Sequence, residues 1–134
     1  MTLYEPEVPP DPAEWLALDE QERIALAEAH HRTARIKLPN VKVHAVFHAI
    51  IENQIAEGLD PVLRAMKRLA NEGLSRHDAI HAIASVCAEH LFEAMTSKDQ
   101  DIATIAQARY IAAVERLTAR SWHREYGAQQ RVVG

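Results

Sequence analysis

The sequence predicts an all-α protein, a single-domain bundle of four to five helices. Alanine, isoleucine and leucine dominate the apolar residues while glycine and aromatic residues are scarce, a composition typical of helices. Apolar residues recur with the period of a helix in several stretches, and no stretch alternates as a strand does. Capping residues, prolines and glycines separate these stretches and indicate where each helix begins and ends.

Length and charge narrow the class of protein. A chain of 134 residues is expected to form one core that buries about two-thirds of the unfolded surface. The net charge is −4 with scattered lysines and arginines, so we expect no nucleic-acid partner. The single cysteine, Cys87, excludes an internal disulfide and is typical of a reducing compartment. The first residues are unlike a signal peptide and no apolar run has membrane-spanning length. We therefore expect a cytoplasmic protein with no membrane partner.

The first third of the chain combines an arm with two helical stretches. Residues 1–10 carry three prolines and two glutamates, which predicts an extended N-terminal arm that contributes little to the core. The stretch Asp11-Pro12-Ala13-Glu14 is a strong helix start, because Asp can cap the helix and Pro suits its first turn. Asp19 with Glu22 then restarts or continues a helix to about Arg35.

The middle of the chain predicts a central helix. Leu38-Pro39-Asn40 breaks the preceding helix, and its asparagine is placed to cap the next one. Residues 41–57 are apolar nearly all round, which is typical of a helix at the centre of a bundle. Gly58 ends this helix, and Asp60-Pro61 is expected to cap another with a one-sided apolar face. A left-handed Gly73 is expected to close it.

Two further helices complete the predicted bundle. The stretch Ser75-Arg76-His77-Asp78 resembles a capping box and opens a helix to about Met95. Ser97-Lys98-Asp99-Gln100 caps the final helix, in which apolar residues again recur with helical period. The predicted organisation is thus the arm, a helical bundle domain over residues 11–126 and a frayed tail over residues 127–134.

Two pairs of histidines are the strongest candidates for chemistry. His44 with His48, and His77 with His81, are each four residues apart and each followed by Ala-Ile. This spacing stacks two imidazoles on one face of a helix, where both can bind one metal ion. Glu52 adds a carboxylate one turn after the first pair. We expect the two pairs to face each other across one helix–helix contact, with Glu52 at its edge. Such a site would suit zinc, or iron, manganese or nickel with solvent in the remaining positions.

Other interpretations of the same residues remain open. Glu28 and His31 form a Glu-x-x-His pair as in carboxylate di-iron bundles, but only one such pair is present. The stretch His77-Asp78-Ala79-Ile80-His81 is similar to a zinc-protease motif, yet its Asp is short and Ser75 indicates that it caps the helix. We predict no catalytic residues and no conventional enzyme. In the main alternative the histidines hydrogen-bond one another in the core of a structural or protein-interaction module, expected as a homodimer.

Several stretches also carry a family resemblance, from about Trp15 through Tyr110. They are Trp15-Leu16-Ala17-Leu18, His44-Ala45-Val46-Phe47-His48-Ala49-Ile50-Ile51-Glu52-Asn53-Gln54, Arg68-Leu69, and Gly73-Leu74-Ser75-Arg76-His77-Asp78-Ala79-Ile80-His81-Ala82-Ile83. In these the chain resembles a bacterial family of short uncharacterised proteins, domain of unknown function 1841. The resemblance implies a helical, cytoplasmic, bacterial protein and no known activity.

Overall fold

The computed structural model confirms the all-α class. It describes residues 3–33, 41–97 and 100–133, with side chains described for 3–30, 42–97 and 105–126. Within these ranges there is no strand, and seven helices occur rather than the four or five predicted. They are α1 (Pro12–Ala17), α2 (Glu20–Thr33), α3 (Val41–Ala56), α4 (Asp60–Asn71), α5 (Arg76–Thr96), α6 (Gln100–Arg116) and α7 (Ala119–Val133). In the described part of the chain, none of these helices has the length and apolar character needed to cross a bilayer.

Reciprocal caps explain the additional helices. Asp19 Oδ1 accepts a hydrogen bond from the Glu22 amide at 2.8 Å, so α2 begins separately from α1. Thr118 Oγ1 accepts from the Ser121 amide and Ser121 Oγ accepts from the Thr118 amide, both at 3.0 Å. This second capping box, which was not predicted from the sequence, separates α7 from α6. The backbone of α7 then continues to Val133, through most of the range predicted to be a frayed tail.

The predicted caps divide into three groups. The side chains of Asp11 and Ser75 cap α1 and α5 as predicted, accepting from amides three residues ahead. Asp60 was wrongly predicted as a cap: Leu59 holds that position without a side-chain bond, and Asp60 is the first residue of α4. At that position its negative charge interacts favourably with the positive end of the helix dipole. Asn40 and Asp99 lie outside the described residues.

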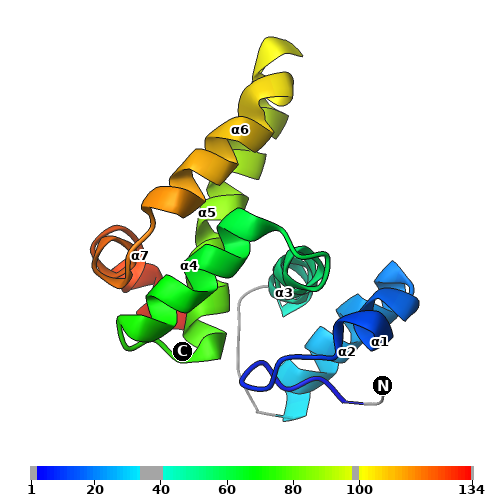
Figure 1. Ribbon diagram of the computed structural model, residues 1–134. Helices are drawn as coiled ribbons and strands as arrows, with labels where there is room; N and C mark the ends of the chain where they lie inside the picture. Colours follow the sequence, from blue (N-terminus) through cyan, green and yellow to red (C-terminus); the bar gives the residue numbers. More distant parts are fainter. Residues whose placement is uncertain (1–2, 34–40, 98–99, 134) are drawn as a thin grey trace.

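The apolar core consists of two clusters with α3 between them (Figure 1). The smaller cluster joins the arm, α1, α2 and α3 through Tyr4, Trp15, Ala27, Ala45 and Ala49. The larger cluster joins α3 to α4, α5, α6 and α7 and contains Ile51, Val62, Ala65, Leu69, Ala79, Ile80, Ala82, Ile83, Val86, Tyr110, Val114, Leu117 and Trp122. Because α3 packs against both clusters, it needs apolar residues on more than one face.

The N-terminal arm is part of the core, contrary to our expectation. Tyr4 is only 4% exposed, and Pro6 is fully buried. The Tyr4 ring lies 5.6 Å from the ring of Trp15, centroid to centroid. A buried tyrosine removes a large apolar area from water, which offsets the entropy lost when a short arm is ordered. The arm thereby covers one side of α3.

The environment of Cys87 leads to a first prediction. This half-buried thiol on α5 packs against the larger cluster, and burial raises its pKa to about 11. The reactive thiolate is therefore scarce near neutral pH. We expect the folded protein to react with dithiobisnitrobenzoate near pH 8 at least about 100-fold more slowly than the urea-unfolded chain. The reaction is measured by absorbance, and equal rates for the folded and unfolded chains would contradict the burial of this thiol.

Candidate metal centre

Three histidine nitrogens converge where α3 passes α5. Nε2 of His81, on α5, lies 2.9 Å from Nε2 of His44 and 3.1 Å from Nε2 of His48, both on α3. The ligand atoms of all three side chains lie within 4.8 Å of one another. The i, i+4 spacing aligns the two rings on α3, and the contact between the helices adds the third. The sequence predicted all three of these residues as metal ligands.

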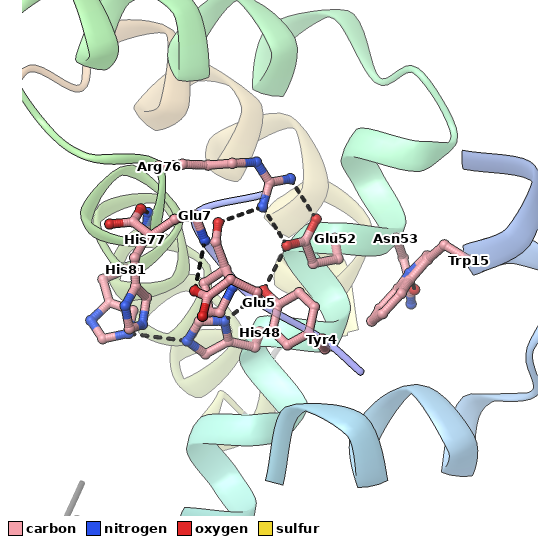
Figure 2. A network of polar contacts seen from close by, with 11 residues as sticks. Tyr4, Glu5, Glu7, Trp15, His48, Glu52, Asn53, Arg76, His77 and His81 are labelled. Atoms are coloured by element: carbon pink, nitrogen blue, oxygen red, sulfur yellow. Dashed lines mark hydrogen bonds and ion pairs between the residues drawn. The ribbon is translucent and has the colours of Figure 1, made fainter. Parts of the chain in front are cut away.

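The other ring nitrogen of His48 is held by the arm. Tyr4 Oη donates to Glu52 Oε2 at 2.6 Å, and His48 Nδ1 lies 3.1 Å from the same phenol oxygen (Figure 2). The phenol has only one proton, and it points to Glu52 in this hydrogen bond. The phenol oxygen is therefore the acceptor for Nδ1–H of His48. Burial, and then the charge of Glu52, raise the pKa of Tyr4 well above its usual range and keep this proton in place. The lone pair of His48 is consequently on Nε2, which points to the other two histidines.

A buried ion pair anchors this chain of hydrogen bonds. Arg76, at the start of α5, donates from Nη1 to Glu52 Oε2 and from Nη2 to Oε1, each at 2.7 Å. Nη1 also donates to the carbonyl oxygen of Pro6 at 2.8 Å, so the arm is tied to both helices. Burial opposes the charge on Arg76, but the hydrogen bonds and attraction of Glu52 outweigh it and raise its pKa.

This ion pair changes the role of Glu52. We predicted its carboxylate as a metal ligand at the edge of the histidine contact. In the structure Glu52 is 1% exposed and both of its oxygens accept hydrogen bonds from Tyr4 or Arg76. It is not among the three side chains whose ligand atoms converge. Glu52 therefore orients His48 through Tyr4.

His77 lies beside the converging nitrogens. Its ring centroid is 4.4 Å from that of His81 and 5.1 Å from that of His48. Its Nε2 is buried and has no hydrogen-bond partner among the described residues, and it does not belong to the converging group. The amide of His77 donates to Glu7 Oε1 at 2.7 Å, a further contact between arm and α5. Burial, and then the neighbouring His30, lower the pKa of His77.

The remaining predicted ligands belong to α2. Glu28 is half-buried and does not join the converging group, and the side chain of His31 is outside the described residues. The adjacent His30, which the sequence did not single out, has its ring 5.7 Å from that of His77. Sequence reasoning also missed Tyr4, because an aromatic residue in a proline-rich arm carries no local signal of a tertiary contact.

A cavity of about 540 Å³ opens beside the three histidines. His44, His48 and His81 form one part of its wall, together with side chains of α3, α5 and α7. The converging nitrogens are therefore not sealed in the core. An ion held by them would keep coordination positions that a small molecule can reach through this cavity.

The fold and the site define a helical protein with a three-histidine centre that borders a cavity. No family model, no curated protein and no solved structure matches the chain. The resemblance to domain of unknown function 1841 thus stays a prediction.

Proposed function

We propose that this protein binds one divalent metal ion, preferably zinc, through Nε2 of His44, His48 and His81. The single observation that carries the proposal is the convergence of these three nitrogens, with His81 Nε2 at 2.9 and 3.1 Å from the other two. Because the three histidines line the cavity, a zinc ion held by them would have a fourth coordination position open to exchange, unlike the ion of a closed structural site.

Hydrogen bonding alone satisfies this arrangement poorly. Each imidazole nitrogen carries either one proton or one lone pair in the ring plane. His81 Nε2 can thus make one good hydrogen bond, although two nitrogens lie within reach. The tautomer of His48 presents a lone pair to the centre, since its Nδ1–H is used by Tyr4. A cation accepts all three lone pairs at once, which favours metal binding over a hydrogen-bonded histidine core.

The ligand set favours zinc among the divalent metals. Three nitrogens about 2.0–2.1 Å from a tetrahedral zinc ion lie about 3.4 Å apart. The two distances to His81 Nε2, 2.9 and 3.1 Å, would therefore need to lengthen by only a few tenths of an ångström. Iron and manganese usually take carboxylate ligands as well, and Glu52 is engaged by Tyr4 and Arg76. Iron and manganese are therefore expected to bind more weakly than zinc.

The test is the metal content and metal affinity of protein produced without a histidine tag. Elemental analysis should find about one zinc ion per chain, and chelation should lower the melting temperature because the ion binds only the folded state. Zinc added back to the apo-protein should restore the zinc content and the melting temperature, and calorimetry should measure its affinity. The proposal is contradicted if the protein takes up no zinc, cobalt or nickel and if chelator does not change its melting temperature. The histidines would then be a hydrogen-bonded core.

Tyr4→Phe should weaken zinc binding by about 10–100-fold, because His48 Nδ1–H loses the acceptor that orients its ring. The matched control is Tyr110→Phe. Tyr110 is equally buried, at 4% exposure, and donates to Gln54 Oε1 at 2.6 Å, in a contact that involves none of the three ligands. Tyr4→Phe loses two hydrogen bonds and Tyr110→Phe loses one, but only the bond to His48 involves a ligand. Only Tyr4→Phe should therefore change the dissociation constant in calorimetry. Equal zinc affinity in the two variants would contradict the role assigned to Tyr4.

A further inference from the structure

The cavity beside the histidines has two chemically different ends. His81 lies at one end, and α5 continues along the wall through Ala84, Ser85, Ala88 and Glu89. These residues share one face of the helix because they recur every three or four positions. At a rise of about 1.5 Å per residue, Glu89 lies about 12 Å along the axis from His81. A molecule that fills the cavity can therefore touch the metal centre with one end and Glu89 with the other.

The wall between these ends is largely apolar. Ala84 and Ala88 leave room where larger side chains would fill the space, and Phe47, Phe92 and Trp122 border it with aromatic rings. The Trp122 side chain is 2% exposed and its Nε1–H has no hydrogen-bond acceptor among the described residues.

The outer end is acidic. Tyr126 of α7 donates its hydroxyl proton to Glu89 Oε2, which holds the carboxylate at the cavity wall. Glu89 is exposed and retains lone pairs for a further donor. A second carboxylate placed there would be repelled, whereas an amine or amide would be attracted. With a metal ion bound by the three histidines, the cavity would combine a cationic centre, an apolar middle and an anionic outer end.

We propose that the cavity binds an elongated small molecule with a metal-ligating anionic head, an apolar body and a hydrogen-bond donor at its far end. The proposal rests on the proposed metal centre, which would bind the head. A volume of about 540 Å³ is within the range of small-molecule sites. The apolar body would displace water from the surface between the aromatic rings and the alanines.

The test measures the binding of four probes to the zinc-loaded protein by calorimetry. Acetohydroxamate has the ligating head alone, phenylbutanehydroxamate adds an apolar body, and its para-aminomethyl derivative adds a donor. We expect phenylbutanehydroxamate to bind at least about tenfold more tightly than acetohydroxamate, since burial of a few methylene groups suffices for this gain. The aminomethyl derivative should bind more tightly again, and a para-carboxyl derivative, used for comparison, more weakly.

Two substitutions locate the probes. Ala88→Phe should fill the cavity and remove the gain of the phenylbutyl chain, with zinc content and acetohydroxamate binding unchanged. The matched control is Ala70→Phe, at an exposed position on α4. Glu89→Gln, an exposed change that should preserve folding, should remove the preference for the aminomethyl over the carboxyl derivative.

The outcomes separate the two proposals. A protein that binds no metal overturns the metal centre, and the ligand proposal with it. A protein that binds zinc and acetohydroxamate, but gains nothing from the phenylbutyl chain, overturns the ligand proposal alone. The ligand proposal is also overturned if Ala88→Phe and Glu89→Gln change none of the probe affinities.

Discussion

His81→Ala should abolish high-affinity zinc binding. Nε2 of His81 is the nitrogen that lies within 3.1 Å of both His44 and His48, so its loss leaves two ligands on one helix and none on the other. The fall in affinity should exceed the about 10–100-fold cost of losing an orienting hydrogen bond, because a ligand itself is removed. Calorimetry measures this change directly. Thermal unfolding should show it too, since zinc at 100 times its dissociation constant stabilises the wild type by about 2.7 kcal/mol.

The matched control for this substitution is His123→Ala. His123 is exposed on α7 and is not one of the three converging side chains. The His123→Ala variant should bind zinc as the wild type does and gain the same stabilisation from the ion. If His81→Ala retained wild-type affinity, the ion would be held elsewhere and the three-histidine centre would be wrong.

Arg76→Met should destabilise the fold by about 3–5 kcal/mol. The substitution leaves the Glu52 carboxylate, which is 1% exposed, without the two charge-assisted bonds at 2.7 Å that compensate its burial. It also removes the bond from Arg76 to the Pro6 carbonyl, which helps to hold the arm. A urea titration of the metal-free protein measures this loss separately from any effect on zinc.

An exposed ion pair of the same residue types provides the comparison. Arg64 lies 3.2 Å from Glu115, with side chains 57% and 41% exposed, so Arg64→Met should cost at most about 1 kcal/mol. Adding Glu52→Gln to Arg76→Met should restore part of the lost stability, because the buried charge is then absent. Equal losses from Arg64→Met and Arg76→Met would show that the burial of Glu52 carries no special cost.

Helices and caps were predictable because short-range interactions determine them. Asp11 and Ser75 bond to amides three residues away, so the relevant partners are visible in the sequence. The errors were also local. The sequence suggested Asp60 as a cap where the chain enters the helix one residue earlier, and the capping box of Thr118 and Ser121 was overlooked inside an apolar stripe.

The candidate site was predictable in part. The i, i+4 spacing of His44 and His48 determines that their rings share a face, whatever the rest of the fold does. The sequence could not choose between the two histidines of the second pair. The packing of α5 against α3 brings Nε2 of His81 to the centre and leaves Nε2 of His77 outside it. A spacing describes one helix, whereas a coordination site depends on where two helices touch.

The sequence alone therefore determines the all-α class, most helix starts and the histidine pair on α3. Tertiary structure decides that Tyr4 orients His48, 44 residues away, and that Arg76 neutralises Glu52, 24 residues away. It also decides that the small residues Ala84 and Ala88 of α5 line a cavity. The physical reason is that these contacts arise only when the arm, α3, α5 and α7 pack together. Residue patterns encode the local geometry of each segment, but the relative placement of segments depends on burial summed over the whole chain.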